Sequence, residues 1–325
     1  MFLLPKIPEH KELINIAFRK GRLAANSIRG SKKPKSKEVR ARIAEEERIK
    51  TISNFLQSKF ECILQKFPRY EKLPRFYQRL LDLKISKDDY KRTLGALKWC
   101  SKIVRNLEKE KISEIKKGKN LNASREFLGR VSSVLKQISD DLKNLNEMRK
   151  LIENFPVVED IETLVIAGYA NVGKSTFLRN LTGSKVKVAP YPFTTKDILV
   201  AYKNFKYEKY QIIDTPGLLD RPIEKRNKIE MQAILALEEL ANKVLFIFDP
   251  TIEIEKQISL YGNVKKILKN VEILAVINKK DISEQDEIEK FKNRLKNFDI
   301  SILDDISANN KKDCERIFMK IFELN

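Results

Sequence analysis

The segment Gly168–Ser175, which reads GYANVGKS, constrains this chain more than any other feature. It matches the template G-x-x-x-x-G-K-[ST], with an apolar run before it and the helix-like TFLRNL after it. In such a strand–loop–helix arrangement the glycines let the backbone curl. Its N–H groups then point at phosphate oxygens, aided by the positive end of the helix. The segment therefore predicts a phosphate-binding loop in which Lys174 reaches the β- and γ-phosphates.

Short β-rich runs alternate with helical stretches over residues 158–325. The last three runs are separated by periodic helices, a pattern typical of a mostly parallel sheet flanked by helices. We therefore expect an α/β domain over 158–325. The predicted strands are Thr163–Ala167, Ile198–Tyr202, Tyr210–Ile213, Val244–Phe248, Ile273–Ile277 and Ile300–Leu303.

A second motif, Asp214-Thr215-Pro216-Gly217, stands at the end of a predicted strand. Asp214 is predicted to hold Mg²⁺ through water, and Gly217 to sense the γ-phosphate through its N–H. The Ser175 hydroxyl would bind the same Mg²⁺. Within PYPFTTK, which lies between the two motifs, Thr195 would complete the Mg²⁺ shell, with Thr194 as the alternative.

A third motif, Asn278-Lys279-Lys280-Asp281, follows another predicted strand. A carboxylate there accepts hydrogen bonds from N1 and the exocyclic amine of guanine, which adenine cannot offer. Ser307-Ala308 follows the last predicted strand and would support the base through a backbone N–H. The motifs predict a P-loop GTPase domain that binds GTP and GDP through Gly168, Tyr169, Ala170, Asn171, Val172, Gly173, Lys174, Ser175, Thr176, Asp214, Gly217, Asn278, Lys279, Asp281, Ser307 and Ala308.

The motifs contain few residues that could catalyse hydrolysis. Leu218 follows Gly217, where many small GTPases place a glutamine that orients water, so we expect slow intrinsic hydrolysis. Asn171 is either a loop-stabilising amide or, as in several GTPases with a similar loop, a residue that helps hold K⁺. Arg221 is either a salt-bridged switch residue or an arginine finger. The predicted catalytic set is Lys174, Thr195, Gly217 and Asn171.

Residues 1–157 differ in both pattern and charge. Apolar residues recur at intervals of three and four, which predicts a bundle of helices near 41–67, 74–83, 86–117 and 122–152. Residues 1–150 hold 38 Lys and Arg against 18 Asp and Glu, a net charge of +20, whereas the rest of the chain is neutral. This asymmetry favours a polyanionic partner. The candidate contact residues are Arg19, Lys20, Arg22, Arg29, Lys32, Lys33, Lys35 and Lys37.

The switch region TPGLLDRPIEKRNKIEMQAILALEEL, residues 215–240, resembles that of the nucleolar GTP-binding (Nog) proteins among the Obg-related GTPases. PYPFTTK fits the same group, and LPRFYQRLLDLKISKDDYKRTLGALKWCSKIV, residues 73–104, resembles its helical N-terminal region. The resemblance implies a GTPase switch that assists large-subunit assembly and binds precursor rRNA and ribosomal proteins. The chain looks like the compact archaeal type.

The alternative is a non-ribosomal signalling GTPase whose helices dock on a protein or a membrane. No apolar run approaches the roughly 18 residues that a membrane span needs, and no lipidation signal is present. The three scattered cysteines indicate a reducing compartment. We therefore expect a cytoplasmic protein with no membrane partner, monomeric when free.

Overall fold

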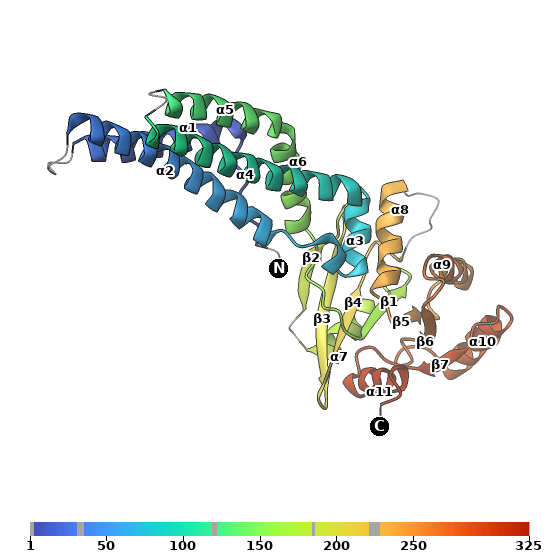
Figure 1. The fold of residues 1–325 in the computed structure, drawn as a ribbon. Helices are drawn as coiled ribbons and strands as arrows, with labels where there is room; N and C mark the ends of the chain where they lie inside the picture. The colour runs from blue at the N-terminus through green and yellow to red at the C-terminus, as the bar shows by residue number, and fades with distance from the viewer. Residues whose placement is uncertain (1–2, 31–35, 119–121, 184–185, 221–227, 325) are drawn as a thin grey trace. The chain divides into compact units, whose positions relative to one another are not determined.

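The computed structural model describes residues 3–30, 36–118, 122–183, 186–220 and 228–324 (Figure 1). Within these ranges, none of the helices combines the length and the apolar character needed to cross a lipid bilayer. The chain divides into two compact units. We call residues 1–73 and 85–153 the helical unit, and residues 74–84 and 154–325 the sheet unit. Arg221 lies outside the described residues.

The helical unit is a bundle of amphipathic helices, as the periodicity predicts. In α2, for example, Ile49, Ile52, Leu56, Phe60 and Ile63 are buried, at spacings that place them along one side of the helix. The unit contains α1 (His10–Arg29), α2 (Lys37–Lys66), the 3₁₀ turn η1 (Tyr70–Lys72), α4 (Lys87–Lys116), α5 (Ala123–Gln137) and α6 (Ser139–Glu153).

The helix predicted over 122–152 is two helices. The backbone leaves helical geometry at Ile138 (φ −94°, ψ 15°), between α5 and α6. Ser139 and the acidic first turn that follows favour a new helix N-terminus. Ile138 itself is buried, so apolar periodicity continues across the break and hides it in the sequence.

The short helix α3 (Arg75–Asp82) belongs to the sheet unit, although its residues lie within the predicted helical domain 1–157. The Tyr77 hydroxyl donates to the Pro156 carbonyl at 2.9 Å and accepts from the Val158 N–H at 3.1 Å. The Tyr77 ring stacks on Phe155 with centroids 5.7 Å apart. These contacts attach α3 to the chain that leads into the sheet.

The sheet has seven strands in the order β2-β3-β4-β1-β5-β6-β7 (Figure 1). Strands β4, β1, β5, β6 and β7 are parallel, and β2 and β3 are antiparallel additions, which confirms a mostly parallel sheet. Strand β2 was not predicted because three of its four residues are exposed at the sheet edge. The strands are β1 (Thr163–Gly168), β2 (Lys187–Pro190), β3 (Asp197–Phe205), β4 (Glu208–Asp214), β5 (Lys243–Phe248), β6 (Glu272–Ile277) and β7 (Ile302–Asp305).

Helices flank this sheet and close its core. Phe177 of α7 and Phe318 of α11 share one apolar cluster with Ile166 of β1 and Ile212 of β4. All six residues of β1 are buried, as expected for a strand at the centre of a parallel sheet. Ligands of such sheets bind outside the carboxyl ends of the strands. The helices are α7 (Lys174–Thr182), α8 (Lys228–Leu235), η3 (Ala236–Glu239), α9 (Ile254–Ile267), α10 (Gln285–Lys296) and α11 (Lys311–Ile321).

Candidate functional site

The predicted phosphate loop joins β1 to α7, and its shape requires glycine at two positions. Gly168 has φ 140°, and a Cβ there would lie 2.5 Å from the Ile247 carbonyl oxygen. Gly173 has φ 98°, and a Cβ there would lie 2.3 Å from Nδ2 of Asn278. The first clash is with the backbone of β5, and the second would displace the Asn278 side chain. Together with the positive φ angles, these contacts favour glycine at both positions and place the loop against β5 and Asn278.

Lys174, the first residue of α7, lies inside this loop. Its side chain is buried, and Nζ donates to the carbonyl oxygens of Gly168 at 2.8 Å and Tyr169 at 2.6 Å. Burial lowers the pKa of Lys174, while the charge of Asp214 acts in the opposite direction. The loop therefore holds an ammonium group beside its own N–H groups, which together favour an anionic ligand.

Ser175 and Asp214 meet at the carboxyl end of β4. The Ser175 hydroxyl donates to Oδ2 of Asp214 at 2.5 Å. The other carboxyl oxygen, Oδ1, is buried with no hydrogen-bond partner among the described residues, and burial raises the pKa of Asp214. A buried carboxylate with one unsatisfied oxygen, next to a hydroxyl, suits a hard cation bound directly by the hydroxyl and through water by the carboxylate.

The segment after β4 carries Gly217 and Asp220. The Gly217 N–H donates to Oδ2 of Asp220 at 2.8 Å, so a carboxylate of the chain itself occupies the acceptor position expected for a γ-phosphate oxygen. Leu218 is fully buried, in keeping with an apolar residue that orients no water. Sequence reasoning did not single out Asp220, which lies three residues beyond Gly217.

The two threonines of PYPFTTK differ in their surroundings. The Thr194 hydroxyl donates to the Tyr191 carbonyl at 2.9 Å and accepts from the Lys196 N–H at 3.2 Å. Thr195 is exposed, and its hydroxyl has no hydrogen bond to any residue that the structure describes. Thr194 therefore stabilises the local turn. Neither hydroxyl bonds to Ser175 or Asp214, so the structure does not bring the predicted third Mg²⁺ ligand together with the other two.

Asn278 links the phosphate loop to the segment after β7. Its Nδ2 donates to the Val172 carbonyl at 2.8 Å, and its Oδ1 accepts from the Ala308 N–H at 2.7 Å. The Ser307 N–H donates to Asp313 at 2.9 Å. The amides of both Ser307 and Ala308 thus bond within the protein, and Asn278 joins the phosphate loop to the segment after β7.

Asp281 lies at the mouth of a hollow of about 600 Å³ that also includes Ser307 and Gln285. The Asp281 carboxylate is exposed, ready to accept hydrogen bonds from a ligand. The neighbouring Lys279 instead points to Asp249, with Nζ and Oδ2 2.6 Å apart. The predicted base-reading segment is therefore assembled beside an open hollow.

Two buried carboxylates that sequence reasoning missed support this segment. Asp249 follows β5 directly and anchors Lys279, so its position at a strand end could have identified it. Asp313, on α11, pairs with Lys280 at 2.6 Å. Burial alone would raise the pKa of Asp313, but hydrogen bonds from Lys280 and the Ser307 N–H bring the net shift below its usual range. No local motif marks Asp313.

Comparison with known protein families finds a matching family model for each half of the chain. Residues 3–159 match the family model of the "NOG1 N-terminal helical domain", and residues 163–298 match that of a "50S ribosome-binding GTPase". The chain is 40% identical to an uncharacterized protein of Methanocaldococcus jannaschii over 293 residues, which cover 88% of this chain and 82% of the relative. It is 34% identical over 302 residues to nucleolar GTP-binding protein 1 of Saccharomyces cerevisiae. The chain belongs to the Nog family.

This chain carries its GTPase domain C-terminal to the helical domain. The match covers 90% of this chain but 46% of the yeast relative, so the chain spans about half the length of that protein. Among solved structures, one described as a nucleolar GTP-binding protein 1 of Plasmodium falciparum is 32% identical. It covers 52% of this chain and 89% of its own, with a TM-score of 0.44.

Proposed function

We propose that this Nog family member is a GTP-hydrolysing switch that assists assembly of the large ribosomal subunit, with its helical unit docking on rRNA. The observation that carries the proposal is the pairing of Ser175 with Asp214 next to the phosphate loop that holds Lys174. This pair and the hollow beside Asp281 both follow the carboxyl ends of parallel strands. The family description "50S ribosome-binding GTPase" and the name of the yeast relative support the ribosomal part.

The nucleotide would lie along the carboxyl ends of β1, β6 and β7. Backbone N–H groups from Gly168 to Thr176 would surround the phosphates, with Lys174 exchanging its two carbonyl partners for phosphate oxygens. Asp281 would accept from N1 and the exocyclic amine of guanine. Asn278 would keep the phosphate loop and the base-reading segments at the spacing that one nucleotide requires.

Mg²⁺ fits the Ser175 and Asp214 pair, and when bound it would supply positive charge to the phosphates. The Ser175 hydroxyl would coordinate it directly and Asp214 through water, which satisfies the orphan Oδ1. Thr195 is our choice over Thr194 for the remaining protein ligand, because the Thr194 hydroxyl already bonds within its turn.

Intrinsic hydrolysis would be slow, because the buried Leu218 cannot orient a water molecule. Asn171 offers a route to acceleration. It is exposed at the phosphate loop with a left-handed backbone (φ 64°), and we propose that it helps hold K⁺ against the phosphates. We expect GTP turnover in KCl to exceed turnover in NaCl at equal ionic strength, and equal rates would exclude the K⁺ role.

The switch would act through Thr195 and Gly217. When GTP and Mg²⁺ are bound, the γ-phosphate would compete with Asp220 for the Gly217 N–H, and Thr195 would be drawn to the metal. GDP offers neither contact. This difference in contacts is the free-energy source that a nucleotide-dependent change of partner affinity requires.

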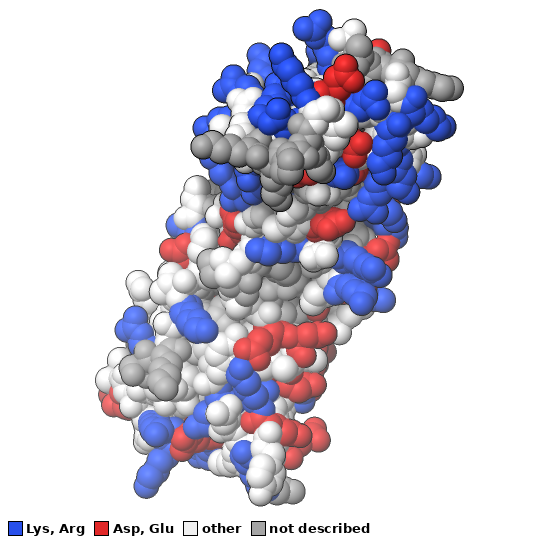
Figure 2. All heavy atoms as spheres, turned by 60° about the vertical axis from the view of Figure 1, so that its left-hand side comes forward, with Lys and Arg blue, Asp and Glu red and all other residues white. Residues whose placement is uncertain are grey.

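The helical unit would supply the docking surface. Lys and Arg side chains gather over this unit on the face drawn in Figure 2. Among the candidate contacts, Lys32, Lys33 and Lys35 lie outside the described residues. Those that the structure places are all exposed, as phosphate contacts need to be: Arg19, Lys20, Arg22, Arg29 and Lys37.

Sucrose-gradient sedimentation tests the assembly role. We expect the tagged protein to sediment with large-subunit precursors to different extents with GDP and with a non-hydrolysable GTP analogue. Lys174→Ala, which removes the phosphate-binding ammonium, should abolish that difference. Absence of the wild-type protein from the precursors with both nucleotides would refute the proposal.

A further inference from the structure

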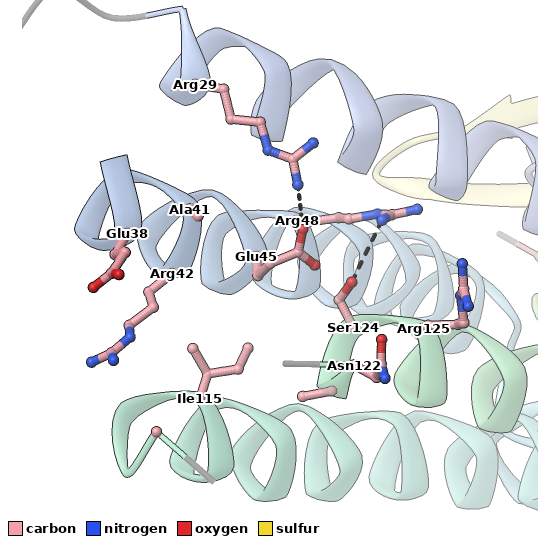
Figure 3. A pocket seen from close by; sticks show the side chains of 12 residues that line it. Arg29, Glu38, Ala41, Arg42, Glu45, Arg48, Ile115, Asn122, Ser124 and Arg125 are labelled. Carbon is pink, nitrogen blue, oxygen red and sulfur yellow. Dashed lines mark hydrogen bonds and ion pairs between the residues drawn. The ribbon is translucent and has the colours of Figure 1, made fainter. Parts of the chain in front are cut away.

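A pocket lies in the helical unit, where three long helices meet the start of a fourth (Figure 3). It has a volume of about 660 Å³ and is bordered by α1, α2, the end of α4 and the first turn of α5. A pocket of roughly 300–1,000 Å³ is the usual size for a small ligand, and a single nucleotide falls within it.

Arginine dominates the lining. Its four arginines are Arg29 from α1, Arg42 and Arg48 from α2, and Arg125 from α5. Two carboxylates, Glu38 and Glu45, also line the pocket, so its net charge is +2. Arg29 is paired with Glu45. Arg42 and Arg125 form no ion pair with any residue that the structure describes, which leaves two guanidinium groups available to a ligand.

The most deeply placed of these arginines is also short of partners. Arg48 Nη1 lies 3.5 Å from the Ser124 hydroxyl, at the limit of a hydrogen bond, and its Nε is buried without a hydrogen-bond partner in the described part of the chain (Figure 3). A guanidinium group has five N–H donors and no acceptor. Arg48 is half-buried, and its unused donors favour an acceptor beside it in the pocket.

The start of α5 adds positive potential at the same place. Ala123, Ser124 and Arg125 form its first turn and line the pocket. The N-terminal end of a helix carries partial positive charge, so a cation there, such as Arg125, is locally unfavourable. An anion at this end of the pocket would offset this repulsion and accept hydrogen bonds from Arg125, whereas Arg42 lies at the opposite end of the pocket (Figure 3).

We propose that this pocket binds a phosphate group carried by an RNA strand. The planar fork of arginine matches two phosphate oxygens at once, which a scattered set of surface lysines does not achieve. The inference rests on the proposed docking of the helical unit on rRNA, and assigns one anchoring point within it. Other basic residues of the unit would contribute through the general attraction of charge.

A charge-matched pair of double variants tests the pocket. Arg42→Gln with Arg125→Gln removes two exposed pocket arginines, and Arg69→Gln with Arg92→Gln removes two exposed arginines elsewhere in the helical unit. Affinity for a fluorescent large-subunit rRNA fragment would be measured over a range of KCl, with GDP and Mg²⁺ saturating the sheet unit. We expect the pocket variant to bind about tenfold more weakly than the control variant. Its slope of log affinity against log salt should fall by about 0.7 for each lost phosphate contact.

Arg48→Lys provides a second test, because it keeps the positive charge and removes the planar guanidinium group. We expect it to weaken RNA binding nearly as much as the double variant, with unchanged far-ultraviolet circular dichroism. Equal affinity of the pocket and control variants would overturn the inference, while binding by the wild-type protein would leave rRNA docking intact.

Failure of the wild-type protein to bind rRNA would instead refute the docking proposal. In that case, calorimetric titration with AMP and with inorganic phosphate, again with GDP and Mg²⁺ present, would decide whether the pocket takes a free phosphate ligand. Binding that the Arg42→Gln, Arg125→Gln variant loses would support a phosphate site served by a free ligand. Absence of binding would overturn the inference as well.

Discussion

The two parts of this chain use charge in opposite ways. Around the phosphate loop, Lys174, Asp214 and Asp313 are buried and each has a specific partner. Over residues 1–150 the chain instead carries its whole net charge of +20, and many of the basic side chains are exposed. Buried charges fix a geometry, whereas exposed charges create a field that attracts a partner. The proposed nucleotide site can therefore be described residue by residue. The proposed docking surface is instead a distribution of exposed charge, in which the pocket lined by Arg29, Arg42, Arg48 and Arg125 is the one defined point among the described residues.

Asp281→Asn should have the largest effect on one unit alone, because it replaces the side chain proposed to bind guanine and leaves the helical unit unchanged. The amide would turn a donor toward the N–H groups of guanine. We expect GTP affinity to fall about 30-fold or more, the usual cost of losing one partner of a charged hydrogen-bonded pair. Titration with fluorescent GTP measures it. Asp286→Asn, an exposed control on α10, should bind GTP like the wild-type protein. Equal affinities of the two variants would contradict the assignment.

Asp214→Asn tests whether the buried carboxylate serves the metal. We expect GTP affinity in Mg²⁺ to fall roughly 10- to 100-fold, as for other residues that hold a metal through an outer shell. The loss should vanish when both proteins are compared in EDTA. A loss of equal size with and without Mg²⁺ would show that Asp214 acts on the loop rather than on the metal.

The same variant has a consequence for stability. Because burial raises the pKa of Asp214 in the folded chain, its carboxyl favours folding below its unfolded pKa, and this contribution is lost as pH rises through the folded pKa. In EDTA, Asp214→Asn should therefore have a higher Tm than the wild-type protein at pH 7. Scanning calorimetry would show the gap closing toward pH 4. A gap that does not change with pH would contradict this cause.

Asp220→Ala removes the internal acceptor of the Gly217 N–H. The γ-phosphate would then meet a free donor, so we expect affinity for a non-hydrolysable GTP analogue to rise about 3- to 10-fold relative to GDP, the equivalent of one hydrogen bond. Asp160→Ala, an exposed control in the same unit, should leave that ratio unchanged. A ratio that stays at the wild-type value in Asp220→Ala would show that Asp220 does not compete with the γ-phosphate.

Tyr77→Phe tests whether α3 is attached to the sheet unit, and it has the smallest expected effect. Loss of the hydroxyl removes its bonds to Pro156 and Val158, and should lower the free energy of unfolding by about 1–2 kcal/mol. Chemical denaturation measures it. Tyr207→Phe is the control, because that side chain is fully exposed. Equal stability of the two variants would show that these bonds do not hold α3 to the sheet unit.

The strand-end motifs could be predicted because each is a contiguous run of residue types with a fixed spacing. The link made by Asn278 could not, because its partners Val172 and Ala308 lie 106 and 30 residues away along the chain. The place of α3 depends in the same way on partners about 80 residues from Tyr77. Long-range hydrogen bonds are set by the fold and leave no local pattern.

Other differences between the sequence predictions and the structure have local causes. Strand β2 carries exposed residues and so lacks the apolar pattern of a buried strand. The break between α5 and α6 falls on a buried residue, Ile138, and therefore does not interrupt the apolar period. The arginines of the pocket in the helical unit come from three helices, and only Arg29 among them was a predicted contact residue. Charge counting predicted the basic unit, but not which of its arginines line one pocket.

The central claim is that the sheet unit reads the nucleotide while the helical unit holds the RNA. The most direct test is mass-spectrometric mapping of peptides crosslinked to RNA in the particle-bound protein, combined with photocrosslinking of a GTP analogue. The account predicts RNA crosslinks concentrated in residues 1–153, including the neighbourhood of Arg42 and Arg125, and nucleotide crosslinks between residues 168 and 308. RNA crosslinks confined to residues 154–325 would contradict it.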